Sequence, residues 1–484
     1  MKRLVDISLV SGPPLLDSTF SSDELAPRRR AHSTPDAPRR EATLAGGAGL
    51  DWAVVVGLRR KASDRITREL AQTVQETGRP LGEIDRRLLG RSAVHTVVAD
   101  HAAELGVHGQ ALWPVDLEQA YAVAVEDAIF GYGRLQPLFE IPEAENIEIH
   151  GCDSVVVQYS DGRRLPHPPV ADSDEELVEA IRFLGESVTP ARPFDDAHPT
   201  MTLALGDRFR LHAIGFGLSF RPSITIRQHT LTEITLKELA DGSMMPLEVA
   251  RLLHAAVLAR KSIVISGDQG AGKTTLLRAL IAAIPASERF GTLETDYELL
   301  THLQPGRRNM LALQAKVGMG ETHYGKRLGE FTVADLIPEA LRQNLSRLIV
   351  GEVRGGEAGA MFEAMTAGAG TLSTTHSHSA ASTMDRLASR VAQGGVLSVD
   401  EAYRQIAHHI HLLVHVQLVD DTWRGGSRSR LVAEIRQLTG GMEAGRPVTH
   451  LAYRGDPFDG GNARFTPDPD FLAELAPFES GWQR

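Results

Sequence analysis

The segment Ile263-Val-Ile-Ser-Gly-Asp-Gln-Gly-Ala-Gly-Lys-Thr-Thr275 decides the fold of this chain. Residues 262–266 have the length and apolar character of a short buried strand, and residues 273–284 have helical spacing up to Pro285. Between the two, Gly267–Thr274 fits the pattern G-x-x-x-x-G-K-[ST] of a phosphate-binding loop. The strand and the helix are the context that this motif requires, so the segment predicts a nucleotide-binding α/β domain.

The residue types in this loop suit a bound triphosphate, ATP or GTP. Glycines accept the positive φ angles with which backbone N–H groups converge on phosphate oxygens, and the following helix directs its partly positive N-terminus at the anion. Lys273 is expected to reach the β and γ phosphates, and the Thr274 hydroxyl is a candidate Mg²⁺ ligand. The residues expected to bind the nucleotide are Gly267, Asp268, Gln269, Gly270, Ala271, Gly272, Lys273, Thr274 and Thr275.

Carboxylates at the ends of two other predicted strands are candidates for catalysis. Glu352 ends the apolar segment 348–352 and is the candidate general base for the attacking water; it is also a candidate Mg²⁺ ligand, directly or through water. Glu294 and Glu298 follow the strand 290–294 and are expected to face the nucleotide or its metal. The alternative for these two is a solvated acidic loop.

Histidines and arginines complete the set of candidates. His376, at the end of the strand 371–376, could sense the γ phosphate by hydrogen bonding. An arginine from the preceding region could reach the phosphate from another domain or subunit, or could be an ordinary surface residue. These arginines are Arg208, Arg210, Arg221 and Arg227.

A second group of histidines is interpreted as surface residues. His408, His409, His411 and His415 lie close together in the sequence. If 411–419 is a strand, His411 and His415 share a face but stand ~13 Å apart, too far for one metal ion.

Composition limits the function classes. The 484 residues are 42% hydrophobic and 23% charged, with a formal net charge of −11, which argues against a dedicated nucleic-acid binder. The one cysteine, Cys152, excludes an internal disulfide and a cysteine zinc site and is interpreted as a small buried or half-buried residue. No apolar run reaches the ~18 residues of a membrane span, and Met1–Val10 is too short and interrupted for a signal peptide, so any membrane contact is expected to be peripheral.

Changes in hydrophobic periodicity divide the chain into five parts, and the fold class is α/β. The two ends, residues 1–60 and 441–484, are expected to be a disordered tail and a loose extension rich in Gly, Pro and Asp. Residues 61–130 are expected to be helical, and 131–232 to form a small α/β domain. Strand and helix patterns alternate over 233–440, which predicts a mainly parallel sheet with helices on both faces.

Several segments together resemble one family, the secretion and pilus ATPases of the type II/type IV superfamily, and within it the CpaF-like ATPases of tight-adherence pilus systems. The most specific segment is Gly351-Glu-Val-Arg-Gly-Gly-Glu-Ala358, and order and spacing match over about 130–440. The other segments are Gly131–Phe139, Phe209–Ala213, Ser223–Gln228, the phosphate loop, Glu294–Leu299 and Gly370–His376.

The resemblance implies a cytoplasmic homohexamer, peripheral at the inner face of the cytoplasmic membrane. Each chain would have a sensory-like (PAS-like) N-terminal α/β domain and a RecA-like P-loop ATPase domain, with the nucleotide between them. ATP hydrolysis, with Mg²⁺, would move the domains and drive an inner-membrane platform protein, and no nucleic-acid partner is expected. By their match to the family's motifs, the catalytic residues would be Lys273, Glu294, Glu298, Glu352, His376, Arg210 and Arg227, and Thr274 would be the Mg²⁺ residue.

The sequence departs from the family at two places. Thr295 follows Glu294 where the family's acidic box has Asp, with Asp296 one place later, and Ser377-His378 replace Ala-Asn after His376. Two alternatives therefore stay open beside the motor ATPase: a nucleic-acid motor on the same core, and a low-turnover ATP-binding regulator.

Overall fold

The described part of the computed structural model begins at residue 50. It covers residues 50–484 except 80, 189–190, 207, 230–232, 305, 317, 324–325, 354, 356, 368–369, 396, 456–462 and 484. Most of the expected tail, and Arg354 and Gly356 of the segment that carries the family resemblance, therefore lie outside the described residues.

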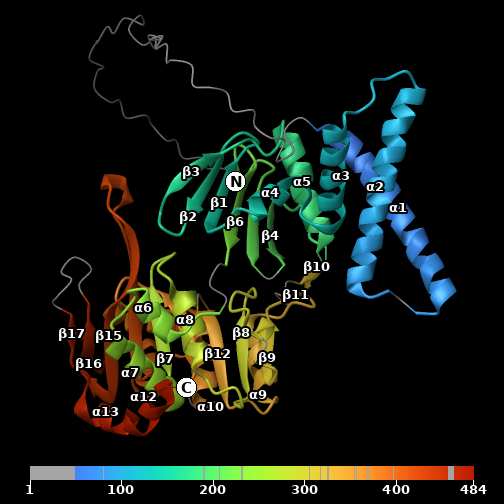
Figure 1. Cartoon of the computed structure of the whole chain (residues 1–484). Coiled ribbons are helices and arrows are strands. Elements are labelled where there is room, and N and C mark those ends of the chain that lie inside the picture. The colour runs from blue at the N-terminus through green and yellow to red at the C-terminus, as the bar shows by residue number, and fades with distance from the viewer. Residues whose placement is uncertain are drawn as a thin grey trace, which may run out of the picture. The chain divides into compact units, whose positions relative to one another are not determined.

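Three helices open the described chain: α1 (Trp52–Thr77), α2 (Glu83–Val107) and α3 (Val115–Phe130) (Figure 1). The helical region starts at Trp52, before the expected boundary at 61, because the Asp51 side chain caps α1 by accepting from the Ala53 N–H. A small apolar core holds the helices together, and it includes Val55, Leu58, Val94, Val98 and Val125.

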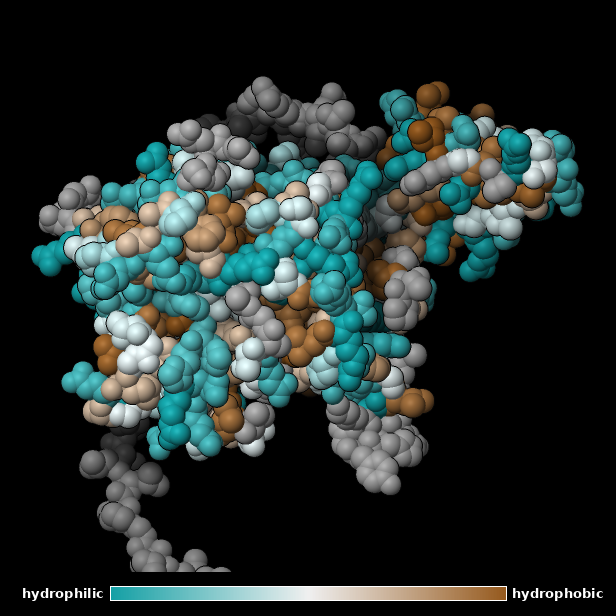
Figure 2. Space-filling model, turned by 90° about the horizontal axis from the view of Figure 1, so that it is seen from below, coloured by the Kyte–Doolittle hydropathy of each residue, from teal (hydrophilic) through white to brown (hydrophobic). Residues whose placement is uncertain are grey.

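These helices also expose apolar side chains. Figure 2 shows hydrophobic atoms among hydrophilic ones on the helices at the right of the view. Ile84, Val107 and Val115 are 78, 84 and 78% exposed. Within the described residues, this surface is not covered by other parts of the chain.

The small domain is an antiparallel sheet covered by one longer helix. Its strand order is β3-β2-β1-β6-β5-β4, and α5 packs Leu177, Ile181 and Leu184 into the same core as Ile147 and Ile226. The elements are η1 (Gly133–Leu135), α4 (Gln136–Phe139), β1 (Ala144–His150), β2 (Val155–Tyr159), β3 (Arg164–His167), α5 (Asp174–Ser187), β4 (Thr200–Leu205), β5 (Phe209–Ile214) and β6 (Ser223–Gln228).

The larger sheet has nine strands in the order β17-β16-β15-β14-β7-β13-β12-β8-β9. The five neighbouring pairs from β14 to β9 are parallel and the three from β17 to β14 are antiparallel, so the sheet is mixed. The strands are β7 (Ile263–Gly267), β8 (Phe290–Glu294), β9 (Met310–Gln314), β12 (Arg347–Val353), β13 (Leu372–His376), β14 (Leu412–Asp420), β15 (Arg428–Glu443), β16 (Arg446–Arg454) and β17 (Arg464–Phe465).

Helices cover both faces of this sheet, as the alternating pattern predicted. On one face Ile263 and Ile265 of β7 pack with α6, α7, α8 and α13; on the other, Val264 packs with α9, α10, α11 and α12. A hairpin, β10 (Met319–His323) and β11 (Lys326–Leu328), lies outside both sheets. The helices are α6 (Leu236–Asp241), α7 (Leu247–Leu258), α8 (Lys273–Ala282), α9 (Val333–Leu341), α10 (Glu357–Ala367), α11 (Ala380–Gln393), α12 (Val399–His409) and α13 (Pro469–Leu475), with short turns η2 (Thr301–Leu303), η3 (Thr422–Arg424) and η4 (Ala476–Gln483).

The prediction of a loose extension over 441–484 is wrong for the residues that the structure describes. β15 continues through the expected boundary at 440, and β16 and β17 extend the same sheet. Phe471 and Leu475 of α13 are buried in the main core, and the Lys261 ammonium binds Glu474 at 2.5 Å. The many Gly and Asp residues hid this strand pattern, because the apolar residues that fill the core are few and far apart.

None of the helices within the described residues is both long enough and apolar enough to cross a membrane.

A buried ion pair ties the large domain together, and its loss is predicted to be costly. Arg347 is 1% exposed and bonds Glu288 through two nitrogens, at 2.7 and 2.9 Å. Glu288→Gln leaves this guanidinium without its counter-charge, so the free energy of unfolding is expected to fall by about 3 to 5 kcal/mol. Urea unfolding followed by circular dichroism measures the change.

The matched control is Glu339→Gln. Glu339 pairs with Arg342 at 3.0 Å, but the two side chains are 62 and 68% exposed, so the expected loss is below about 1 kcal/mol. Equal unfolding midpoints for the two variants would contradict the prediction.

Candidate active site

The phosphate loop joins β7 to α8 at the carboxyl edge of the parallel strands. Gly270 and Gly272 have φ angles of 75° and 94°, and Gly272 is the N-cap of α8. A side chain at Gly267 would put its Cβ 2.3 Å from the Val416 carbonyl oxygen of β14. Glycine is therefore required at this position by the neighbouring strand, and at the two later ones by the backbone conformation.

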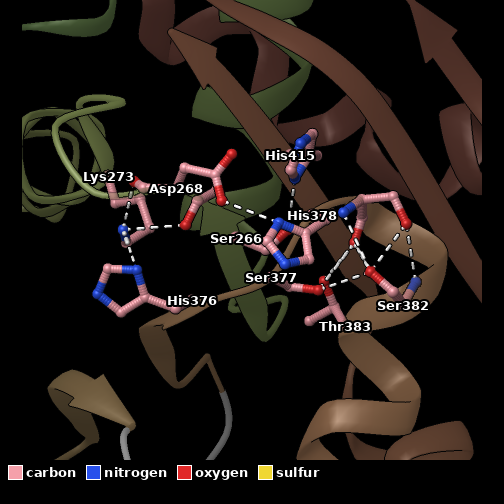
Figure 3. Close-up of polar contacts among 11 residues, drawn as sticks. Ser266, Asp268, Lys273, His376, Ser377, His378, Ser382, Thr383 and His415 are labelled. Carbon is pink, nitrogen blue, oxygen red and sulfur yellow. Dashed lines mark hydrogen bonds and ion pairs between the residues drawn. The ribbon is translucent and has the colours of Figure 1, made fainter. Parts of the chain in front are cut away.

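Lys273 lies inside the loop and is only 8% exposed. Its ammonium donates to the carbonyl oxygens of Gly267 at 3.0 Å and Asp268 at 2.8 Å, and to His376 Nδ1 at 3.2 Å (Figure 3). The lysine charge is thus held at the mouth of the loop, where phosphate oxygens would need it.

His376 connects the lysine to the candidate base. Parallel pairing of β13 with β7 sets His376 opposite Gly267, and its Nε2 lies 2.8 Å from Glu352 Oε1. Because an ammonium can only donate, Nδ1 accepts from Lys273, and Nε2 is the ring nitrogen that faces the Glu352 carboxylate. Lys273, His376 and Glu352 therefore form one continuous polar chain.

Glu294 is the most deeply buried carboxylate of the site. It is 3% exposed, and its Oε1 accepts from the backbone N–H groups of Glu298 at 2.9 Å and Leu299 at 2.8 Å. Its Oε2 is buried and has no partner among the described residues. Burial raises the pKa of Glu294 to about 7, despite the two backbone donors.

Arg210 reaches the acidic cluster from the small domain. Its guanidinium on β5 donates to Glu298 and, at 2.6 Å, to Asp296. Arg227 lies opposite Arg210 on β6. Burial lowers the pKa of Arg278 on α8 to about 10, and the charge of Arg227 adds to this effect. The structure thus brings Arg210 to the acidic residues and places Arg227 beside it.

These side chains share one pocket with the metal candidate Thr274. A buried carboxylate oxygen, a hydroxyl and a second carboxylate are the oxygen ligands that a hard divalent cation prefers, so the residues fit bound Mg²⁺. The pocket is lined by Arg210, Thr274, Glu294, Thr295, Asp296, Glu298, Leu299, Gly351 and Glu352.

The remaining residues of the loop and its surroundings are placed as follows. Asp268 and Gln269 are exposed, and His378 Nδ1 lies 3.0 Å from Asp268 Oδ1 (Figure 3). Ala271 is buried, and Thr275 lies within α8, half-buried.

The interpretation of the later histidines as surface residues is wrong for His415, and only His408 of the four is exposed, since His409 and His411 are half-buried. His415 is 7% exposed, with its Nδ1 3.1 Å from Ser266 Oγ beneath the loop (Figure 3). His411 is half-buried, and burial lowers its pKa to about 4. β14 lies inside the sheet, between β7 and β15, and helices pack on both of its faces, which spacing within one strand cannot reveal.

Two of the arginines proposed from the sequence do not line this pocket. Arg221 pairs with Asp153 and Asp174 in the small domain, and Arg208 lies over the Phe209 ring. Among the described residues, no group of three or more His, Cys, Asp or Glu side chains could hold a metal ion by themselves.

Sequence reasoning missed two arginines at the loop. Arg430 Nε donates to the Gly270 carbonyl oxygen at 2.8 Å, and Arg428 lies beside it. Both also bond Glu145 of β1, at 2.8 Å from Arg428 and 2.5 Å from Arg430. The sequence pattern that could have identified them is that Arg428 and Arg430 are two residues apart, which puts both side chains on the same face of a strand.

Comparisons with known proteins agree on one family. The family model described as "Type II/IV secretion system protein" matches residues 168–439, more than half of the chain. A putative conjugal transfer protein of Mycobacterium tuberculosis is 30% identical over 333 residues, which are 66% of this chain and 89% of that protein. The type IV secretion system protein VirB11 of Brucella suis is 28% identical over 312 residues, covering 58% of this chain and 83% of that protein.

The solved structures are more distant. The crystal structure of the VirB11 ATPase from Brucella suis in complex with sulphate is 23% identical and covers 63% of this chain and 96% of its own. The TM-score is 0.33, so the superposition carries no argument about this chain.

The raised pKa of Glu294 leads to a prediction about protons. With a pKa of about 7, the Glu294 carboxyl is largely protonated at pH 6.5 in the absence of ligand. A cation bound beside Oε2 favours the ionised carboxylate, so binding of Mg²⁺ and nucleotide at this pH should release a proton from Glu294. At pH 8.5 the carboxyl is already ionised, and this release should vanish. Isothermal titration calorimetry in buffers of different ionisation enthalpy counts the protons.

The control is Glu294→Gln, which has no carboxyl to titrate. The difference between the native chain and this variant isolates Glu294 from protons that the nucleotide itself releases. The same proton count for both chains at pH 6.5 would show that Glu294 keeps its proton, and so does not face the cation.

Proposed function

The chain belongs to the type II/IV secretion system protein family, and from that premise we propose that it is an ATP-hydrolysing motor of a secretion or pilus-assembly system. The observation that carries the proposal is the polar chain from Lys273 through His376 to Glu352. It joins the phosphate-binding lysine of the loop to a carboxylate at the end of a neighbouring strand, which is the arrangement that hydrolysis of a phosphate needs.

Each residue then has a defined task. The loop N–H groups and Lys273 bind the phosphates, and Glu352 accepts a proton from the attacking water. His376 keeps Glu352 oriented through its Nε2–H. When bound, Mg²⁺ would neutralise charge on the phosphate oxygens; Thr274, Glu294 and Glu352, directly or through water, are the residues that would hold it.

Arg210 connects the small domain to the same chemistry. In this structure its partners are the carboxylates of Asp296 and Glu298. A triphosphate carries more negative charge than a carboxylate and would compete for the same guanidinium. Arg227 on the adjacent strand adds a second positive charge. Movement of these arginines toward the nucleotide would couple hydrolysis to motion of the small domain.

The finer assignments rest on the resemblance and are part of the proposal. They are a CpaF-like motor of a tight-adherence pilus, a homohexamer, an inner-membrane platform protein as partner, and a place at the cytoplasmic face of the membrane. The large domain would be RecA-like and the small one PAS-like. The names of the relatives, a conjugal transfer protein and a type IV secretion protein, fit a motor that moves macromolecules across a membrane.

A steady-state ATPase assay tests the proposal. Glu352→Gln removes the general base but keeps the shape of the side chain, so kcat is expected to fall about 10²- to 10⁴-fold with a small change in KM. Glu339→Gln, an exposed glutamate in the same domain, serves as the control. If the native chain is no faster than Glu352→Gln, the motor assignment fails and a low-turnover regulator remains; stimulation by DNA would favour a nucleic-acid motor.

Assembly gives a second test. If the site is completed by the arrangement of domains in a ring, the activity per chain should rise with protein concentration as the ring forms. Sedimentation velocity at the same concentrations reports the size of the assembly. Constant specific activity from a species that stays monomeric would contradict the ring.

A further inference from the structure

We propose that Arg430 is a positioning residue for the phosphate loop: it fixes the Gly270 carbonyl and ties the loop to Glu145 of the small domain. The inference rests on the proposed binding of ATP but concerns residues that the family motifs do not include. It makes nucleotide affinity depend on a contact between the two domains.

The first step is the hydrogen bond to the loop. Arg430 Nε donates to the Gly270 oxygen at 2.8 Å, and the Arg430 Cδ lies 3.3 Å from where a Cβ on Gly272 would stand. The side chain therefore packs along the outside of the loop and against the N-terminus of α8. The opposite, inner side holds the Lys273 ammonium on the Gly267 and Asp268 carbonyls.

The second step is what a phosphate cradle requires. Its N–H groups must point inward at the anion, and its outward carbonyl oxygens need other partners. Gly270 has a φ of 75° and no side chain to restrict it, so its own sterics do not fix the direction of the peptide that follows. Because C=O and N–H of one peptide point in opposite directions, holding the Gly270 oxygen also fixes the N–H of Ala271, which here donates to the Asp268 carbonyl oxygen at 3.3 Å.

The third step is the tether to Glu145. One carboxylate oxygen accepts from Arg430 at 2.5 Å and the other from Arg428 at 2.8 Å. The side chains of Glu145, Arg428 and Arg430 are 17, 7 and 24% exposed, so these bonds are partly shielded from water and salt. Glu145 thus fixes the rotamer of Arg430, and any movement of β1 that takes Glu145 away removes this support from the loop.

The chain of contacts does not include Glu352 or its proton. Loss of Arg430 should therefore weaken nucleotide binding and raise KM, with kcat at saturating nucleotide changed by less than about threefold. This split between KM and kcat separates positioning of the loop from a role in the chemical step.

The experiment measures equilibrium binding of a fluorescent ADP analogue to the full chain, which needs no turnover. Arg430→Gln removes a hydrogen bond with a charged donor, so the Kd is expected to rise about 10- to 100-fold. Arg430→Lys keeps the charge but cannot reach both partners, so its Kd should lie between those of the native chain and Arg430→Gln. The control is Arg446→Gln on β16, whose guanidinium pairs with Asp385 and not with the loop.

A second variant tests the contact between Arg430 and Glu145, and it still tests the proposal if Arg430→Gln does not fold. Glu145→Gln keeps Arg430 but weakens its anchor, and a smaller rise in Kd, about three- to tenfold, is expected. The double variant should bind no more weakly than Arg430→Gln alone, since both act through one contact. Amide hydrogen exchange over residues 267–275 should speed up in each variant while that of β16 does not change.

The outcomes separate this inference from the proposed function. If the native chain binds no nucleotide, the proposed function fails. If it binds, but Arg430→Gln and Glu145→Gln bind as tightly as Arg446→Gln, Arg430 does not position the loop. Additive effects of Glu145→Gln and Arg430→Gln would overturn the tether.

Discussion

The parallel pairing of β7 with β13, and of β13 with β12, is the constraint on which the site depends. Parallel strands bring their carboxyl ends to the same edge of a sheet, and here the register sets His376 opposite Gly267. Residues more than a hundred positions apart thereby come within hydrogen-bond distance, as Lys273 and His376 do at 3.2 Å. The loop glycines serve this arrangement because Gly267 must pass close to β14 before the chain turns into α8.

Most charged groups at this edge of the sheet have polar partners that offset the cost of their burial. Lys273 donates to two carbonyls and to His376, and the Asp296 and Glu298 carboxylates face the Arg210 guanidinium. Glu294 lies deepest, and burial outweighs two backbone donors to raise its pKa to about 7. Contacts from the small domain reach the site at two places, Arg210 on the acidic cluster and Glu145 on the arginines of β15, so the small domain can influence both the metal side and the loop side.

Much of the local structure could be predicted because local patterns carry it. The strand 290–294 has the predicted bounds, and the loop lies between a strand and a helix as the motif required. The predictions failed where contacts between residues distant in sequence determine burial or the length of a strand. His415 is buried by neighbouring strands, and β15 runs through the boundary expected at 440 because its partner β16 continues the sheet.

The sequence by itself determined the chemistry that is local: the glycines that permit the loop conformation, the lysine and threonine inside it, and the glutamate that ends an apolar strand. These follow from residue type and spacing, since a positive φ or a strand end concerns only a few consecutive residues. The tertiary structure alone decided that His376 links Lys273 to Glu352, that burial raises the pKa of Glu294 to about 7, and that Arg430 supports Gly270. Each of these depends on sheet register and burial. Both arise from pairing between segments distant in sequence, so neither can be recognised from one segment alone.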